Sequence, residues 1–313
     1  MIVTVTLNPS LDRTIEVDVL TRGEMIRARS ARLDPGGKGV NVSRALLAGG
    51  EVASTAVVTV GGSEGEQLRR LLAAEGLAVR AVPVAGRTRS NVTIAEPGGV
   101  VTKLNEPGAP LSGDELAEVA GAVAAESAAA SWVAGCGSLP PGVPDGIYAE
   151  LCRRVSAAGI RVAIDSSGPA LLAALPARPD LVKPNREELA EAVGRPVGRL
   201  ADVVEAAREL RARGARGVLV SLGSDGAVLV DDDGVIAGDA PVAHPRSTVG
   251  AGDALLAGFL AAGARGPRAL AEALAWGAAA VRLPASRMPR RSDIRHDIVR
   301  IHSRPDLDQP LVS

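Results

Sequence analysis

Residues 247–260, with the sequence STVGAGDALLAGFL, join a turn of small residues directly to an apolar segment that favours a helix from about Ala251. Gly250 and Gly252 allow a tight turn and let a ligand approach the backbone closely. The first amides of a helix have no internal partner and carry partial positive charge, so they suit an anion such as phosphate. Asp253 lies at this junction, where a carboxylate either stabilises the helix start or accepts a proton beside the anion. This stretch alone does not decide between the two roles.

A second glycine-rich turn occurs about 200 residues earlier, where residues 34–45 read DPGGKGVNVSRA. Gly36, Gly37 and Lys38 introduce a predicted helix that ends near Ala48. The spacing to the lysine is not that of a Walker A loop. Close backbone approach, helix amides and one ammonium nevertheless predict an anion site. The alternative is an ordinary glycine-rich turn with a solvated lysine.

Composition narrows the class of protein. The 313 residues suffice for one large or two small domains, and a hydrophobic content of 46% can form a sizeable core. With two Trp, one Tyr, one Phe and a net charge of −1, the chain has few rings for base stacking and no basic footprint. We therefore do not expect nucleic acid as a partner. Cys136 and Cys152 lack metal-ligand or redox spacing and are expected to be reduced core residues.

Targeting signals are not expected either. Residues 1–7 are apolar, but they lack a basic region and are too short for a signal peptide. The longest Ala-rich stretch, about residues 119–136, is interrupted by Glu126 and is too weakly hydrophobic to span a membrane. We expect a cytoplasmic protein without a membrane partner.

Strand and helix patterns alternate along most of the chain. Strands are predicted at 2–7, 54–60, 79–83, 131–136, 161–165, 181–183 and 217–221, with a hairpin at 228–231 and 235–237. Helices are predicted near 39–48, 66–75 (after a turn at 61–65), 112–127, 145–158, 169–174, 186–193, 201–213, 251–264 and 268–282. This order predicts an α/β fold whose mainly parallel sheet is covered by helices on both faces. Ligands of such folds bind at the carboxyl ends of the strands.

Two segments interrupt this order with alternating polar and apolar residues. Residues 14–19 and 26–33 alternate, as do 88–94 and 100–104, which flank a turn at 96–99. Alternation is typical of strands with one solvated face. We expect the regions 12–34 and 87–105 to form a small projecting sheet within a single domain. Its dry face should cover a site or pack against a second subunit.

Two further strand ends carry candidate ligands. After the strand near Lys183, Asn185 and Glu188 share one face of a helix start, which suits a hydrated magnesium ion. The alternative is a helix N-cap with a capping-box glutamate. Ser221 and Gly223 end another strand and could contact a nucleotide or simply form a turn. The sequence contains neither a nucleophile elbow nor a dinucleotide-binding glycine motif, which disfavours hydrolases and dehydrogenases.

Together, two glycine-rich anion sites, a magnesium-type pair and an acid at a helix start predict phosphoryl transfer. This chemistry depends mainly on positioning, charge neutralisation and deprotonation of the acceptor. At this point the sequence resembles the ribokinase-like sugar kinases of the PfkB family. The resemblance rests on residues 250–253 (GAGD) and 36–41 (GGKGVN) and covers roughly residues 1–290. Residues 34–45 and 102–108 (TKLNEPG) most resemble the bacterial 1-phosphofructokinase branch.

The resemblance implies a role for each matching position. Asp253 would be the general base, and amides from Gly250, Ala251, Gly252 and Asp253 would form the anion hole. Sugar hydroxyls would be held by Asp12, Gly36, Gly37 and Asn41, and the substrate's phosphate by Lys38, Arg89 and Ser138. Asn185 and Glu188 would organise Mg²⁺, and Lys183, Ser221, Gly223, Ser247 and Thr248 would bind ATP. The projecting sheet would be a lid through which two subunits form a homodimer, and Arg27 would reach the neighbouring site.

The expected reaction is phosphorylation of fructose 1-phosphate by ATP at the 6-hydroxyl, which gives fructose 1,6-bisphosphate. Two cations opposite the transfer site suit a phosphorylated sugar better than a neutral one. A 6-phosphofructokinase or a tagatose-6-phosphate kinase is the close alternative, because spacing does not fix which end of the sugar lies at Asp253. A non-catalytic sugar-phosphate sensor is the alternative from another class. The chain departs from the family at Ser166, where Thr is expected, and at Ala254, where a small hydroxyl residue is frequent. Arg287, Arg290 and Arg291 make the region expected near the adenine more basic than in the family, which leaves nucleotide preference open.

Overall fold

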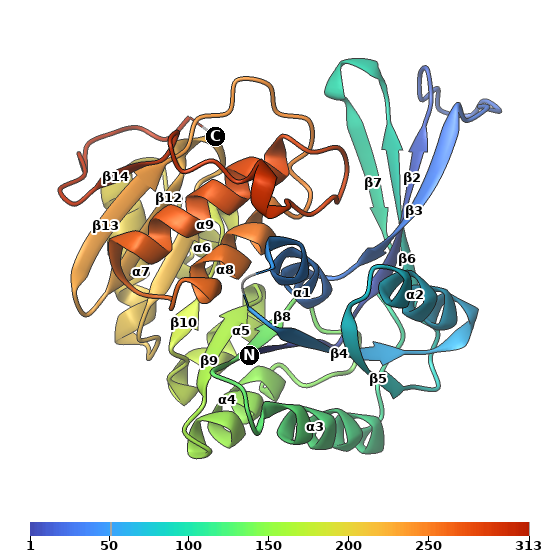
Figure 1. Cartoon of the computed structure of the whole chain (residues 1–313), viewed down its shortest axis with the longest axis horizontal. Coiled ribbons are helices and arrows are strands. Elements are labelled where there is room, and N and C mark those ends of the chain that lie inside the picture. Colours follow the sequence, from blue (N-terminus) through green and yellow to red (C-terminus); the bar gives the residue numbers. More distant parts are fainter. Residues whose placement is uncertain (51, 313) are drawn as a thin grey trace.

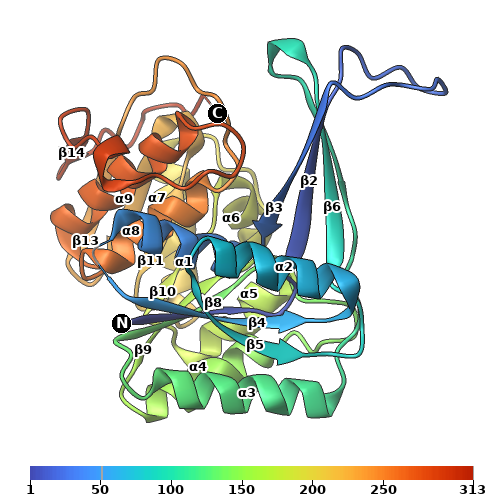
Figure 2. The same ribbon diagram turned by 45° about the vertical axis from the view of Figure 1, so that its right-hand side comes forward.

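The computed structural model describes residues 1–50 and 52–312. Helices cover both faces of a large sheet, and a small second sheet projects from one side of this three-layer body (Figures 1 and 2). This arrangement confirms the predicted fold class. Within the part of the chain that the structure describes, no helix is long and apolar enough to cross a membrane.

The large sheet has ten strands in the order β14-β13-β12-β11-β10-β9-β8-β1-β4-β5. Its strands are β1 (Ile2–Thr6), β4 (Ser54–Val60), β5 (Ala78–Pro83), β8 (Trp132–Cys136), β9 (Arg161–Asp165), β10 (Leu181–Val182), β11 (Val218–Ser221), β12 (Ala227–Asp231), β13 (Gly234–Asp239) and β14 (Arg300–His302). Pairing is parallel from β5 to β11 and antiparallel from β11 to β14. The carboxyl ends of the parallel strands therefore meet at one edge.

Alternation along β1 divides the core between the two faces. Ile2 packs with α1, α8 and α9, whereas Val3 and Val5 pack with α3 to α7. The helices are α1 (Lys38–Gly49), α2 (Gly62–Ala74), α3 (Gly113–Ser127), α4 (Ile147–Ala157), α5 (Gly168–Ala174), α6 (Arg186–Val193), α7 (Leu200–Ala212), α8 (Ala251–Ala261) and α9 (Gly266–Val281), with 3₁₀ turns η1 (Pro97–Gly99), η2 (Leu175–Ala177), η3 (Gly223–Asp225) and η4 (Arg291–Asp293). β1 is buried on both sides, and its sequence IVTVT consists of β-branched residues with no charged one among them.

The projecting sheet has the order β3-β2-β6-β7, with β2 (Ser10–Glu16), β3 (Ser30–Gly36), β6 (Arg89–Ala95) and β7 (Val101–Asn105). β2 pairs in parallel with β6, and the other two pairings are antiparallel. The first two strands lie at different positions from the predicted 14–19 and 26–33. The long-range pairing of Ser10 with Arg89 extends β2 back to residue 10, and no local pattern reports such pairing.

One other expectation was wrong, and one strand was missed. The predicted turn at 61–65 is mostly helix, because α2 already begins at Gly62. Gly61 itself allows a close backbone approach, since a Cβ there would lie 1.9 Å from the carbonyl oxygen of Gly86. The strand β14 was not predicted, and it pairs with β13 through Ile301 and its neighbours.

The tail after β14 returns to the start of α7. The amides of Leu200 and Ala201 donate to the carbonyl oxygens of Gln309 (3.0 Å) and Leu307 (2.8 Å). These are first-turn donors of α7, which lack partners within the helix. The amide of Val312 then donates to Oδ2 of Asp225 at 2.9 Å. The tail thus caps α7 and contacts the turn η3.

Candidate active site

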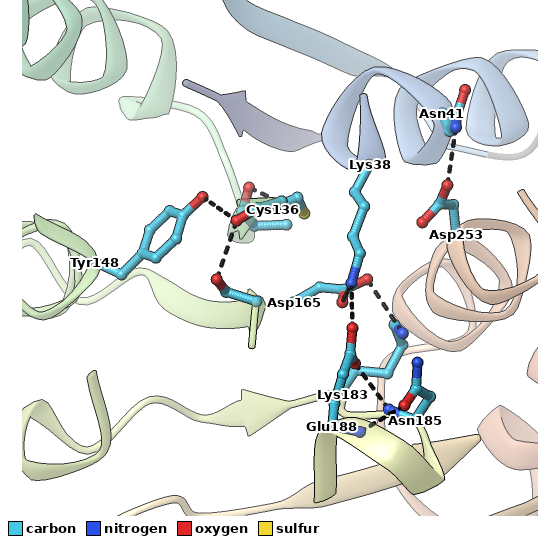
Figure 3. A network of polar contacts seen from close by, with 12 residues as sticks. Lys38, Asn41, Cys136, Tyr148, Asp165, Lys183, Asn185, Glu188 and Asp253 are labelled. Carbon is cyan, nitrogen blue, oxygen red and sulfur yellow. Dashed lines mark hydrogen bonds and ion pairs between the residues drawn. The ribbon is translucent and has the colours of Figure 1, made fainter. Parts of the chain in front are cut away.

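The predicted site residues come from segments that follow parallel strands and from two helix starts. Lys38 opens α1 and Asp253 lies in the first turn of α8, while Asp165 ends β9 and Lys183 follows β10. Figure 3 shows these four side chains between the two helices and the sheet edge, with Lys38 and Lys183 both in contact with Asp165, and with Asp253 in contact with Asn41. Its position agrees with the general location of ligand sites in α/β sheets.

The start of α8 is built as the sequence predicts. Gly250 precedes the helix in the left-handed conformation, with φ 78°, which favours glycine. The Cβ of an alanine at Gly252 would meet its nearest neighbour, Nζ of Lys183, at 3.6 Å. The space beside Gly252 is therefore open apart from this ammonium group, although the amide of Ala251 already donates to the carbonyl oxygen of Thr248 at 3.3 Å. Asp253 is only 8% exposed. No side chain caps the start of α8 with a hydrogen bond, so Asp253 does not act as a helix cap there.

Asn41 holds the carboxylate of Asp253. Its Nδ2 donates to Oδ2 of Asp253 at 2.9 Å, across 212 residues of sequence. Burial, followed by the negative charge of Asp165, raises the pKa of Asp253 to about 6, although the hydrogen bond from Asn41 opposes this rise. A carboxylate with this pKa is ionised at neutral pH and is a stronger base than an ordinary aspartate.

Asp165 is fully buried and contacts two ammonium groups. Its Oδ1 lies 2.9 Å from Nζ of Lys38 and its Oδ2 lies 3.2 Å from Nζ of Lys183. Burial acts to raise the pKa of Asp165, but the two lysines outweigh it and lower the pKa. Asp165 thus links the start of α1 to the lysine beside the start of α8. It was not among the predicted site residues, although its place at the carboxyl end of a buried strand was an available signal.

Lys38 also contacts Glu188, with Nζ 3.0 Å from Oε1. Burial opposes its charged form, but Asp165 and Glu188 outweigh this effect and raise the pKa of Lys38 above its ordinary value. Its ammonium therefore lies between two carboxylates, on the side of the predicted magnesium pair. The predicted pairing of Lys38 with Arg89 around a substrate phosphate remains a prediction.

Asn185 and Glu188 form a capping box at the start of α6. Oδ1 of Asn185 accepts from the Glu188 amide at 2.7 Å, and Oε2 of Glu188 accepts from the Asn185 amide at 2.9 Å. The helix-cap alternative is therefore realised. Among the described residues, no group of three or more His, Cys, Asp or Glu could hold a metal ion. The pair fits only an ion that keeps most of its waters, which is the usual state of Mg²⁺.

The predicted sugar-binding residues meet at the base of the projecting sheet. Asp12 accepts at Oδ1 from Oγ of Ser10 (2.7 Å) and from Nδ2 of Asn91 (3.0 Å). A Cβ at Gly36 would lie 2.3 Å from Oδ2 of Asp12, so only glycine fits there. Gly37 precedes α1 with φ 115°. Asn91 was not predicted as a site residue, although it lies two residues after Arg89 in the segment TRSN, which also matches the family.

Arg89 and Ser138 lie near the segment that follows β7. NH1 of Arg89 donates to the carbonyl oxygen of Glu106 at 3.0 Å, while its buried Nε has no partner within the described chain. Burial lowers the pKa of Arg89. Oγ of Ser138 accepts from Nδ2 of Asn8 at 3.4 Å. An unpartnered guanidinium nitrogen in such a place is suited to an anion.

The predicted nucleotide-binding residues lie along the turns beside α6 and α8. Ser221 bridges to Asn185, and Gly223 opens η3. Oγ of Ser247 accepts from the Val249 amide at 3.2 Å, and the carbonyl oxygen of Thr248 accepts from the Ala251 amide at 3.3 Å. These contacts shape the turn that leads into α8.

Comparison with known proteins agrees with this architecture. Residues 5–288 match the family described as pfkB family carbohydrate kinase. The 1-phosphofructokinase of Rhodobacter capsulatus is 43% identical over 268 residues, which cover 85% of this chain and 84% of that protein. The ATP-dependent 6-phosphofructokinase isozyme 2 of Escherichia coli is 40% identical over 259 residues, covering 82% and 83%.

Solved structures support the same assignment. The crystal structure of phosphofructokinase-2 from Escherichia coli in complex with potassium superposes with a TM-score of 0.87 at 36% identity, covering 93% of this chain and 96% of that one. The sequence match and the fold thus agree over most of the chain. The chain belongs to the pfkB family of carbohydrate kinases.

Proposed function

We propose that the chain transfers the terminal phosphoryl group of ATP to the 6-hydroxyl of fructose 1-phosphate and so forms fructose 1,6-bisphosphate. The observation that carries the proposal is the buried Asp253, held by Asn41 at a helix start where the space beside Gly252 is open apart from Nζ of Lys183. The relatives named 1-phosphofructokinase, such as that of Rhodobacter capsulatus, favour this substrate.

In this mechanism Asp253 takes the proton of the acceptor hydroxyl while the hydroxyl oxygen forms its bond to the terminal phosphorus of ATP. The bond from that phosphorus to the bridging oxygen breaks, and ADP leaves. The amides of Gly250, Ala251, Gly252 and Asp253 stabilise the negative charge on the phosphoryl oxygens. Such pre-positioned donors are effective because they need no reorganisation during the reaction. The pKa of about 6 suits a base that works near neutral pH.

The acceptor is held at the base of the lid sheet. Asp12, Gly36, Gly37 and Asn41 bind sugar hydroxyls, and Asp12 is oriented for this role by Ser10 and Asn91. The phosphate already on the sugar contacts Arg89 and Ser138, supported by the unpartnered Nε of Arg89. Lys38 reaches the same phosphate if it leaves Glu188, since its stem lies beside Gly137, the neighbour of Ser138.

ATP binds along Lys183, Ser221, Gly223, Ser247 and Thr248. Mg²⁺ would neutralise phosphate charge near Asn185 and Glu188. The capping box holds both side chains at one helix start, where water-mediated contacts to the ion are possible. Lys183, held by Asp165 beside Gly252, supplies a second positive charge next to the transferred group.

The lid sheet is proposed to mediate a homodimer. Val101 and Leu104 of β7 are 49% and 57% exposed, and Val100 before them is 56% exposed. Apolar side chains on an edge strand are commonly covered by a partner. We also propose that the protein acts in the cytoplasm, in fructose breakdown that feeds glycolysis.

The second candidate is phosphorylation of fructose 6-phosphate or tagatose 6-phosphate. It is favoured by the 6-phosphofructokinase isozyme 2 of Escherichia coli, at 40% identity. A non-catalytic sensor is disfavoured, because Asp253 and the glycines around it are intact.

The test is a set of steady-state assays with MgATP and each of four acceptors: fructose 1-phosphate, fructose 6-phosphate, tagatose 6-phosphate and free fructose. We expect the highest kcat/KM with fructose 1-phosphate. A higher value with a 6-phosphate would transfer the assignment to the second candidate. Equal turnover of free fructose would contradict the phosphate site at Arg89.

A further inference from the structure

Arg44 is a buried arginine of α1 that lies directly behind the site. It is 6% exposed, and its guanidinium contacts four different segments of the chain. Nε and NH2 both donate to the carboxylate of Glu75, at 2.7 Å each. NH1 donates to the carbonyl oxygens of Pro35 (3.4 Å) and Ser286 (3.2 Å) and to Oδ1 of Asn41 (3.2 Å).

The contact with Asn41 determines which way its amide points. A guanidinium has donors and no acceptor, so the atom of Asn41 that faces Arg44 must be the oxygen. The amide nitrogen then faces Asp253, to which it donates at 2.9 Å. An amide that lacked Arg44 could rotate once Asp253 had gained a proton, because a protonated carboxyl can donate to an amide oxygen.

We propose that Arg44 is a positioning residue that fixes the amide of Asn41, so that Oδ2 of Asp253 stays a hydrogen-bond acceptor and Oδ1 takes the proton of the sugar. This inference rests on the proposed role of Asp253 as the base. In Figure 3, one oxygen of Asp253 faces Asn41 and the other points away from it.

The surroundings of Arg44 make it a rigid support. Its two-pronged ion pair with Glu75, the residue that follows α2, leaves little freedom of rotation. Pro35 belongs to β3 of the lid, and Ser286 lies in the segment after α9. Arg44 therefore joins the lid, the base and the region after α9 through a single group. A purely structural ion pair would stabilise the fold without influencing Asp253.

The two interpretations differ in their effect on the titration of Asp253. The charged groups near this carboxylate are Asp165, Lys183 and Lys38, and Asn41 is its hydrogen-bond donor. Loss of a donor to a carboxylate disfavours the ionised form and raises its pKa. If Arg44 acts through Asn41, removal of Arg44 moves the acidic limb of the pH profile of kcat/KM for the phosphosugar to higher pH. If it serves only the fold, the limb stays in place.

The experiment compares Arg44→Met and Arg44→Lys with Glu75→Gln and Arg265→Met. The last is a matched control, because Arg265 forms an equally two-pronged pair with Asp233 on the surface, at 2.7 and 2.8 Å. We expect both Arg44 variants to shift the acidic limb upward by about half a pH unit or more. We also expect them to lower kcat by about tenfold, because the base is less well held, at unchanged KM for ATP. The substrate phosphate titrates in every variant, so only the difference between variants is used.

Glu75→Gln keeps the guanidinium near Asn41 and should lower the melting temperature with a smaller shift of the limb. Arg265→Met should leave the limb unmoved. Where Arg44→Met does not fold, Arg44→Lys decides, since it keeps a charge that can pair with Glu75 but not the fork that reaches Asn41 as well. In an Asn41→Leu background, replacement of Arg44 should produce no further shift, because the two residues act in series.

An unmoved limb in a folded Arg44 variant, with only a lower melting temperature, would overturn the proposal. So would an additive shift in the Asn41→Leu background. Failure of the proposed function itself has a different signature, because Asp253→Asn would then retain turnover. The two outcomes are therefore separable.

Discussion

The starts of α1 and α8 look alike in sequence, but their glycines have different surroundings. A Cβ at Gly39 would lie 2.5 Å from Oγ1 of Thr6 and 3.1 Å from the carbonyl oxygen of Val5, so this glycine allows α1 to pack against β1. A Cβ at Gly252 would meet only Nζ of Lys183, at 3.6 Å. The first glycine is needed for folding, whereas the second leaves space for a ligand. A glycine-rich motif therefore does not reveal its purpose until its neighbours are known.

The two starts also carry opposite charges. Lys38 opens α1 and is held by Asp165 and Glu188, whereas Asp253 lies in α8 and is held by the neutral Asn41. Asp165 connects the two through its second contact, with Lys183. We infer a division of labour in which α1 positions the acceptor and α8 performs the chemistry. Four predictions test that division, from the largest effect to the smallest.

Asp253→Asn should lower kcat by about 10²–10⁴-fold, the usual contribution of a general base. KM for either substrate should change little, because the amide keeps the shape of the carboxylate. The measurement is steady-state kinetics, with thermal melting as the control for folding. Full turnover in the variant would mean that α8 does not supply the base.

Asp165→Asn should destabilise the fold strongly, because it leaves two lysines beside a neutral group. Removal of one partner from a buried ion pair costs about 3–5 kcal/mol, and Asp165 is 0% exposed. Because its pKa is lowered, this stabilisation is present above the ordinary value of 3.8 and is lost as pH falls below it. Denaturant titration at pH 7 and at acidic pH measures both effects.

The exposed Asp233, which pairs with Arg265, provides the control for that experiment. Asp233→Asn should change the free energy of unfolding by less than about 1 kcal/mol. Similar losses in the two variants would contradict the view that Asp165 links the two helix starts.

Gly39→Ala should mainly lower the stability of the fold, whereas Gly252→Ala should mainly lower kcat. The first forces a methyl group against Thr6 and should cost about 1–3 kcal/mol. The second should leave stability unchanged or slightly increased, because alanine favours a helix by up to about 1 kcal/mol. It should lower kcat by about tenfold or more, since phosphoryl oxygens need the space beside the amide. The same pattern of loss in both variants would remove the distinction between the two starts.

The cost of ionising the buried Asp253 should be measurable, without any substrate, as a pH dependence of the free energy of unfolding. Its pKa is raised from 3.8 to about 6, so the folded state binds this proton more tightly than the unfolded state does. Ionisation therefore costs stability as pH rises from about 4 to about 6, and the cost is constant above that. Asp253→Asn should be more stable than the wild type by roughly 1–3 kcal/mol at pH 8. That difference should disappear near pH 3.5.

Much of the fold follows from local patterns. Runs of β-branched residues such as 2–6 predict strands of a buried sheet, and the alternation of strands with helices predicts its layers. The strand β14 escaped prediction because it contains three residues and only one of them, Ile301, is apolar. Its pairing with β13 is a tertiary event that a window of sequence does not record.

The site was predictable in its motifs but not in its contacts. Asp253 lies in the first turn of α8 as expected, because small residues and an apolar helix mark that start locally. The partners of Lys38 were not predictable, since Asp165 and Glu188 lie 127 and 150 residues away. Arg44 sits within the quoted motif, yet its function depends on Glu75, which follows a different helix.

The tail that caps α7 bears on proteolysis and on the placement of affinity tags. Cleavage before Arg300 would remove β14, which leaves the backbone of β13 as an open sheet edge able to pair with another chain. It would also leave the amides of Leu200 and Ala201 without partners. A nicked protein would therefore keep its catalytic groups and yet aggregate. A tag placed directly after Val312 would lie beside the turn that contains Asp225, because the amide of Val312 donates to that aspartate.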